Sequence, residues 1–120
     1  DVAWFDVVAM LYALGILQPD HCVLTKLDVL SGLDEIKICT GYEYEGHLID
    51  FPMNTFILPE CTPVYTSVKG WSEDIKGITN WNDLPANARR YVETLERLLH
   101  VPIRHVRTGE EWEDIIVRKV

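Results

Sequence analysis

The chain has 120 residues, the size of one ordinary domain, of which 48% are hydrophobic and 25% are charged. This composition supports a buried core and excludes a disordered or fibrous chain. The formal net charge of −8 argues against a nucleic-acid partner, because a phosphate backbone is bound by clustered lysine and arginine. The longest apolar stretch, Val7–Leu17, is too short to span a bilayer, and no basic flank typical of a signal peptide precedes it. We expect neither membrane insertion nor secretion.

The cysteines and histidines predict no metal site. Cys22, Cys39 and Cys61 are widely and irregularly spaced without a C-x-x-C pair, and the four histidines fit no common ligand spacing. An odd number of unpaired cysteines is typical of a reducing compartment, so we expect a cytoplasmic protein. Cys22 stands beside His21, but a small buried side chain is the more common role for such a cysteine than a nucleophile.

The first segment predicts a helix that is buried on every side. Val2–Leu14 contains Asp6 as its only charge, and we place a helix over Ala3–Leu14 with Gly15 as the left-handed residue that ends it. A helix without a polar face belongs inside a larger body than 120 residues usually provide. We therefore expect the chain to be a fragment of a longer protein.

The remaining pattern alternates short strands with turns and contains one amphipathic helix. The helix is predicted over Pro85–Leu99, with capping groups from Asn82 and Asp83. A period-two stretch around Ile36 and Ile38 predicts a hairpin that closes near Gly46. The other expected strands are His21–Thr25, which we expect to be buried, Val64–Val68, Ile103–Val106 and Ile115–Val117.

Three connections complete the expected organisation. We predict a loop or single helical turn over Lys26–Leu33 and a long surface connection over Gly70–Asp83 that holds Trp71 and Trp81. A further loop is punctuated by Pro52, Pro59 and Pro63. The fold class is α/β, with a buried helix and strand followed by antiparallel strands and an amphipathic helix.

Thr25-Lys26-Leu27-Asp28 follows the first predicted strand, at the place where open α/β sheets bind ligands. The Asp28 carboxylate could accept hydrogen bonds from N1–H and the exocyclic amine of guanine. Adenine offers an acceptor at that ring nitrogen, which would leave the carboxylate unpaired. Lys26 could lay its aliphatic stem along the base. An ordinary capped loop is the alternative interpretation of these four residues.

Arg107-Thr108-Gly109 also follows a predicted strand. A glycine there lets a backbone N–H approach a ligand, and guanine O6 accepts such a donor. A plain tight turn is the alternative.

Two other patterns are set aside. Gly41–Gly46 has the spacing of a phosphate-binding loop, but His47 and Leu48 replace the lysine and hydroxyl residue, and Glu43 and Glu45 would repel phosphate. We interpret it as an acidic hairpin tip. Four acidic pairs could suggest acid/base chemistry or Mg²⁺ binding, but solvated turns are the more common role. They are Asp34-Glu35, Glu73-Asp74, Glu110-Glu111 and Glu113-Asp114.

The run TKLDVLSGLDEIKICTGYEYEG, which begins at Thr25, resembles the C-terminal region of the adenylosuccinate synthetase family. Four further segments agree in order, so that the resemblance covers essentially the whole chain. They are Trp4-Phe5-Asp6, GWSEDI at Gly70–Ile75, DLPANARRYV at Asp83–Val92 and Val101-Pro102-Ile103.

The resemblance implies a GTP-dependent ligase of purine biosynthesis, which joins IMP and L-aspartate with Mg²⁺ present to give adenylosuccinate, GDP and phosphate. It implies that Lys26, Leu27 and Asp28 recognise guanine and that Arg107, Thr108 and Gly109 match a second guanine-contacting loop. The family usually has Ser-Thr-Gly-Pro there, so Arg107 and Glu110 depart from its pattern.

The resemblance also implies what these residues lack. The family's glycine-rich phosphate loop, catalytic Asp and His, Mg²⁺ ligands and IMP contacts lie upstream of the matching region, as does an arginine-rich loop that grips aspartate and IMP. We therefore expect residues 1–120 to be one C-terminal segment of a larger P-loop-type ligase domain, without catalytic or metal-binding residues and inactive alone. The family implies a homodimer. The alternative is a stand-alone, non-catalytic binding or assembly module derived from the same fold.

Overall fold

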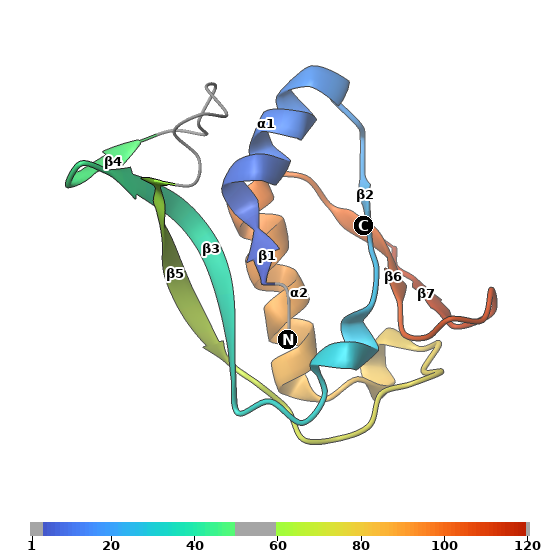
Figure 1. The fold of residues 1–120 in the computed structure, drawn as a ribbon. Coiled ribbons are helices and arrows are strands. Elements are labelled where there is room, and N and C mark those ends of the chain that lie inside the picture. The colour runs from blue at the N-terminus through green and yellow to red at the C-terminus, as the bar shows by residue number, and fades with distance from the viewer. Residues whose placement is uncertain (1–3, 50–59, 120) are drawn as a thin grey trace. The chain divides into compact units, whose positions relative to one another are not determined.

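The computed structural model describes residues 4–49 and 60–119, which divide into two compact units (Figure 1). One unit combines the N-terminal residues up to Gln18 with Lys37–Val68, and the other combines Pro19–Ile36 with Lys69–Val120. Among the described residues, no helix is both long enough and apolar enough to cross a bilayer. That the chain is one C-terminal segment of a larger domain stays a prediction.

A small mixed sheet forms most of the first unit. Strand β1 (Phe5–Asp6) pairs in parallel with β3 (Glu35–Tyr44), and β3 also pairs with β4 (His47–Ile49) and β5 (Thr62–Lys69). The hairpin predicted near Gly46 is confirmed, because Tyr44 faces His47 across an antiparallel turn in which Glu45 and Gly46 have positive φ angles.

Helix α1 (Val7–Leu17) begins later and ends later than the sequence predicted. Asp6 is the N-cap residue, and its carboxylate accepts a hydrogen bond from Ala9 N at 3.0 Å and another from the Tyr42 hydroxyl. The predicted start at Ala3 lies outside the described residues, and the predicted end before Gly15 is wrong. The helix continues through Gly15 to a left-handed Gln18, since one interior glycine costs only about 1 kcal/mol.

The prediction that α1 is buried on every side is wrong for this chain. Only Val7 and Leu14 of the helix are buried, whereas Ile16 and Leu17 are 67% and 73% exposed. Met10, Leu11 and Tyr12 are also exposed. A helix apolar all round needs partners on more than one side, and the described residues do not cover all of its apolar surface.

The second unit contains a three-stranded sheet in the order β2-β6-β7. Strand β2 (Cys22–Leu24) is parallel to β6 (Ile103–Arg107), which is antiparallel to β7 (Ile115–Val117). The 3₁₀ turn η1 (Leu27–Leu30) follows β2 and confirms the helical turn expected there. The burial predicted for β2 is only partly right, because Leu24 is buried whereas Val23 is 55% exposed. The side chains of neighbouring strand residues point to opposite faces of the sheet, and only one face of β2 is covered by the described residues.

Helix α2 (Ala86–Leu99) buries the apolar stripe that the sequence predicted, including Ala88, Val92 and Leu95. The predicted capping by Asn82 and Asp83 is wrong. Both belong to a separate 3₁₀ turn, η3 (Trp81–Asp83), which ends before the helix begins. Pro85 is the N-cap of α2 and offers no side-chain hydrogen bond, consistent with proline's preference for a helix start.

The segment predicted as a surface connection contributes to the core. Trp71 is 3% exposed and Ile75 is fully buried. Trp71 Nε1 donates to Ser31 Oγ at 3.0 Å, and Trp71 O accepts from Gly32 N at 2.8 Å, so this segment is fastened to the residues after η1. The proline loop is also corrected, since Pro63 lies in β5. Pro52 and Pro59 lie outside the described residues.

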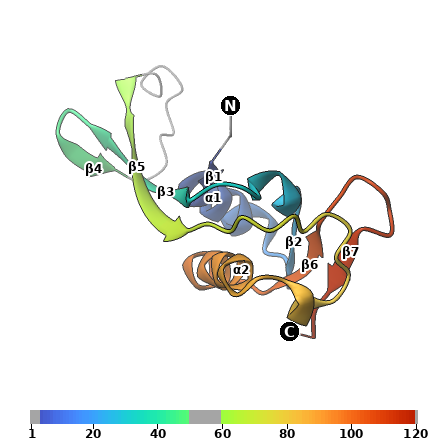
Figure 2. The same ribbon diagram turned by 90° about the horizontal axis from the view of Figure 1, so that it is seen from below.

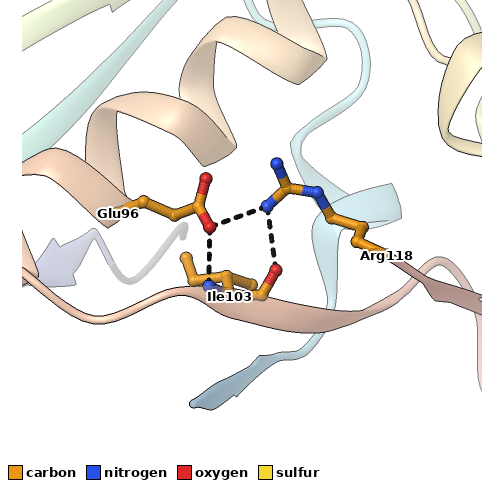
Figure 3. Close-up of polar contacts among 3 residues, drawn as sticks. All are labelled: Glu96, Ile103 and Arg118. Atoms are coloured by element: carbon orange, nitrogen blue, oxygen red, sulfur yellow. Dashed lines mark hydrogen bonds and ion pairs between the residues drawn. The ribbon is translucent and has the colours of Figure 1, made fainter. Parts of the chain in front are cut away.

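One carboxylate fixes the start of β6 (Figure 3). Glu96 Oε2 accepts from Ile103 N at 2.7 Å and lies 2.9 Å from Arg118 Nη1, which also donates to Ile103 O at 2.8 Å. The Arg118 side chain is only 9% exposed, and its guanidinium lies 3.9 Å from the Trp81 ring centroid. This cluster joins α2, the first residue of β6 and the residue after β7.

Replacing Arg118 tests the cluster. We expect Arg118→Met to lower the free energy of unfolding by about 3 kcal/mol, because the mostly buried Glu96 carboxylate loses its counter-charge. Adding Glu96→Gln to that variant should restore part of the loss, since an amide oxygen still accepts from Ile103 N without carrying a charge. Equilibrium urea unfolding measures both, and a double variant less stable than Arg118→Met would contradict the account.

Gly70 is predicted to tolerate no side chain. A Cβ there would lie 1.8 Å from Leu33 O and 2.7 Å from Leu33 C, and backbone atoms cannot move aside cheaply. We expect Gly70→Ala to destabilise the protein by at least about 1–3 kcal/mol. The matched control is Gly15→Ala, because nothing lies within 4 Å of that Cβ and the position is helical. The control should be neutral or stabilising by about 0.5–1 kcal/mol in the same thermal or urea unfolding.

Candidate functional site

The two loops singled out from the sequence lie at the same edge of the second unit's sheet. Strands β2 and β6 are parallel with Leu24 opposite Val106, so the segments that follow them leave the sheet at the same end. Turn η1 also contacts β6. Figure 2 views the unit from the end where η1 follows β2 and the β6–β7 loop follows β6. Ligands of α/β proteins commonly bind beyond the carboxyl ends of parallel strands.

The first loop presents two charged side chains and buries one apolar side chain. Leu27 is 1% exposed and anchors the turn in the core, whereas the Lys26 side chain is exposed and Asp28 is partly exposed. Asp28 O accepts from Ser31 N at 3.2 Å. Among residues 4–49 and 60–119, the Asp28 carboxylate makes no hydrogen bond or ion pair. It is therefore available to accept hydrogen bonds from a ligand.

Lys26 holds a backbone conformation that costs energy. Its φ is +61°, in the left-handed region, which costs a residue with a side chain about 1–2 kcal/mol. Lys26 O accepts from Val29 N at 3.3 Å, and the buried Leu27 follows directly, so the turn and the core hold the strained residue in place. Strain of this kind is concentrated at sites where a side chain must be aimed.

Thr108, in the second loop, is fully buried and uses all its polar groups within the chain. Its Oγ1 donates to Ile78 O at 2.7 Å, its N–H donates to Asp114 O at 2.9 Å, and its carbonyl accepts from Gly77 N at 3.2 Å. These bonds tie the end of β6 to two other segments. Thr108 therefore holds the loop rather than presenting its own hydroxyl group.

Gly109 and Arg107 complete the second loop. A Cβ at Gly109 would lie 2.3 Å from Asp114 Oδ2, so a larger residue there would have to displace the Asp114 side chain that supports the loop. Among the described residues, the Gly109 N–H has no hydrogen-bond acceptor, which leaves it for a ligand. The Arg107 guanidinium donates to the carbonyls of Gly109 and Glu111 and so spans the loop from one side.

Asp114 is a supporting residue that the sequence analysis missed. Its carboxylate accepts from Glu111 N at 3.2 Å, and its carbonyl accepts from Thr108 N. The interpretation of Glu113-Asp114 as a merely solvated pair is therefore wrong for Asp114, which is half-buried. Gly77 and Ile78 support the same loop through backbone atoms, and backbone acceptors and donors have no signature in a sequence.

The two loops together place a hydrogen-bond acceptor, a hydrogen-bond donor and an aliphatic stem at one edge of the β2-β6-β7 sheet. The unpaired Asp28 carboxylate suits N–H donors, the Gly109 N–H suits a carbonyl oxygen, and the Lys26 stem offers an apolar surface for a flat ring. A heterocycle edge that carries a carbonyl beside N–H groups matches these three features.

Other candidate chemistry is weaker in the described part of the chain. The three cysteines form no disulfide with one another, and burial raises the pKa of the Cys22 and Cys39 thiols, which keeps these two protonated and poorly nucleophilic. No group of three or more His, Cys, Asp or Glu side chains in residues 4–49 and 60–119 could hold a metal ion. A surface hollow lined by Thr79–Asn82 and Val117–Lys119 contains none of the six predicted residues.

Comparison with known proteins supports the resemblance found in the sequence. A family model described as adenylosuccinate synthetase matches residues 1–116. An adenylosuccinate synthetase from Pelotomaculum thermopropionicum is 46% identical over 115 residues, which are 95% of this chain and 27% of the relative. One from Brevibacillus brevis is 43% identical over 117 residues, with coverage of 97% and 27%.

A solved structure agrees. The structure of fully ligated adenylosuccinate synthetase from Plasmodium falciparum superposes with a TM-score of 0.92 at 37% identity, over 98% of this chain and 29% of that chain. The α/β fold class is thereby confirmed. The chain spans 27% of the length of the curated relatives it matches. Because the family model covers nearly every residue, the chain belongs to the adenylosuccinate synthetase family.

Proposed function

We propose that these residues are the C-terminal, guanine-recognising portion of an adenylosuccinate synthetase. That enzyme joins IMP and L-aspartate at the expense of GTP, with Mg²⁺, to give adenylosuccinate, GDP and phosphate. One observation carries the proposal. Two loops at the carboxyl ends of adjacent parallel strands carry an unpaired Asp28 carboxylate and an unpaired Gly109 N–H.

The chemistry of these groups favours guanine. Its N1–H and exocyclic amine are neighbouring donors that one carboxylate can accept together, and its O6 accepts from a backbone N–H. Hydrogen bonds to a charged acceptor contribute about 1.5–3 kcal/mol each, more than neutral ones. The Asp28 carboxylate therefore supplies most of the preference, and Gly109 fixes the orientation of the base.

The same groups reject adenine. Adenine places an acceptor where guanine has N1–H and an amine where guanine has O6. The Asp28 carboxylate would then face a lone pair and the Gly109 N–H would face another donor. Leaving such groups unpaired in a closed site discriminates far more strongly than a missing apolar contact does.

The other four predicted site residues shape the pocket in this proposal and do not read the base edge. Lys26 covers one face of the base with its stem. Leu27 anchors the first loop in the core, and Thr108 ties the second loop to Ile78 and Asp114. Arg107 braces the second loop through Gly109 O and Glu111 O. These four shape the pocket, whereas Asp28 and Gly109 read the base.

The bond-making groups belong to other parts of the enzyme in this proposal. The chain spans 27% of its relatives, and its described residues contain no cluster that could hold a metal ion. The Mg²⁺ ligands, the phosphate-binding loop and the IMP and aspartate contacts would come from the remaining length. We propose a cytoplasmic homodimer for the complete enzyme, as the resemblance implies.

Replacing Asp28 tests base recognition. In the complete gene product, Asp28→Asn should raise KM for GTP about 10- to 100-fold, because the amide can no longer accept both guanine donors. Xanthosine triphosphate should improve as a substrate, since its 2-carbonyl accepts from the new amide. Steady-state kinetics with both nucleotides measure the change. The control is Asp20→Asn, an exposed aspartate before the amino end of β2. An unchanged nucleotide preference in Asp28→Asn would refute the assignment.

Residues 1–120 produced alone test the division of labour. We expect no adenylosuccinate formation from IMP, aspartate and GTP, and only weak GDP binding by calorimetry, because phosphate contacts supply much of the affinity for a nucleotide. The complete gene product is the positive control. Turnover by the 120 residues alone would show that the bond-making groups lie within them. A complete gene product that also lacks turnover would favour a binding module.

A further inference from the structure

Trp112 is the most exposed large apolar side chain of the described residues, at 83% exposure. It lies in the loop between β6 and β7, three residues after Gly109. By contrast, Trp71 is buried in the core, and Trp81 is covered by the Arg118 guanidinium. An indole ring offers a large flat apolar surface to whatever covers it, and this one lies in a loop of the candidate site.

The loop that carries Trp112 is held firmly. Glu111, the residue before it, donates its N–H to the Asp114 carboxylate, and Glu111 O accepts from both the Arg107 guanidinium and Asp114 N. Ile115 N donates to Glu113 O at 2.8 Å on the other side. The backbone on both sides of Trp112 is therefore fixed, and the side chain is exposed although the loop is ordered by its own bonds.

The loop that carries Trp112 lies at the same end of the sheet as the candidate site. It follows the carboxyl end of β6, and the neighbouring parallel strand β2 leads into η1 at that end (Figure 2). The base edge would be held in its own plane by Asp28 and Gly109. In-plane hydrogen bonds leave both faces of a purine uncovered, and among the six residues of the proposed pocket the Lys26 stem covers only one face.

We propose that Trp112 stacks on the second face of the guanine base. This inference rests on the proposed function and adds to it a residue that determines affinity without reading the base edge. Stacking of a base on an aromatic side chain tolerates any base, because every base has a π face. Trp112 would therefore raise affinity for purine nucleotides generally, whereas Asp28 would select guanine among them.

The neighbouring charges fix the direction of the nucleotide. Glu110, Glu111 and Glu113 flank Trp112 in the sequence, and their negative charges would repel phosphate groups. The base must therefore point toward this loop while the phosphates point away from it, as a pocket that reads only the base requires.

The test compares Trp112→Ala, Trp112→Phe and Asp28→Asn in the complete gene product. Trp112→Ala should raise the Kd for GDP about 10- to 100-fold, as expected for the loss of one base–aromatic stack. Trp112→Phe should stay within about threefold of the parent, because a phenyl ring still stacks. Tyr65→Ala, which removes an exposed aromatic ring in the other unit, is the matched control and should leave the Kd unchanged.

A spectroscopic readout separates stacking from a general loss of structure. In the parent protein, GDP should quench tryptophan emission and shield it from acrylamide, and both effects should vanish in Trp112→Phe. Inorganic pyrophosphate, which has no base, should produce neither effect. Shielding by GDP that persists in Trp112→Phe would overturn the inference, because another tryptophan would then report the nucleotide.

The failures are distinguishable. If Asp28→Asn weakens GDP binding and Trp112→Ala does not, the stacking inference is wrong and the proposed function stands. If neither variant changes GDP binding, the base lies elsewhere and both proposals fall. If Trp112→Ala weakens GDP and ADP equally while Asp28→Asn alters neither, stacking is upheld and guanine reading by Asp28 is refuted.

Discussion

The parallel pairing of β2 with β6 is the constraint on which the candidate site depends. The two strands come from distant parts of the sequence, and each loop alone is an ordinary turn. Their amino ends are fastened by several bonds. Cys22 N donates to Pro102 O, and Glu96 and Arg118 bind the two backbone groups of Ile103. With that end fixed, the ladder determines where Asp28 and Gly109 leave the sheet. A substitution that shifts the start of β6 should therefore also shift the loop that follows β6, and with it the candidate site.

The distribution of hydrogen bonds separates the residues that hold the loops from the residues that we propose to bind the base. Thr108 and Asp114 use their hydrogen-bonding groups on their own neighbours and are largely shielded from water, as buried polar groups usually are. The Asp28 carboxylate and the Gly109 N–H are unpaired among the described residues, although the loops around them are well bonded. Lys26 adds a strained backbone that this order maintains. Unpaired donors and acceptors in loops whose other polar groups are hydrogen-bonded are typical of a surface that binds a ligand.

Local sequence patterns predicted the local features, and several of the failures have causes that lie outside the local sequence. The stripe of α2, the hairpin at Gly46 and the strand Ile115–Val117 follow from periodicity and turn residues. The start of α1 does not, because Phe5 and Asp6 pair with β3 and Asp6 also binds the Tyr42 hydroxyl, contacts made only in the folded chain. The burial of Trp71 is also non-local, because its indole N–H donates to Ser31, 40 positions earlier in the chain. The support that Asp114 gives to Thr108 is made within one loop, but through a backbone carbonyl that has no signature in the sequence. The motifs single out the six predicted site residues, but they do not show that the two loops lie at one edge of the sheet, since that depends on the β2–β6 pairing.

The two helices differ in how much of their surface the chain satisfies, and the difference bears on function. Helix α2 has one apolar face, on which Ala88, Val92 and Leu95 are buried, while Arg90, Glu93 and Arg97 are exposed. Helix α1 has no charged residue along its length and exposes Ile16 and Leu17. Such a sequence is stable as a helix only where several sides are covered. Under the proposed function these residues belong to a synthetase about three and a half times their length, and the remaining polypeptide covers α1. On that proposal, the same remaining polypeptide both covers the exposed surface of α1 and supplies the bond-making groups.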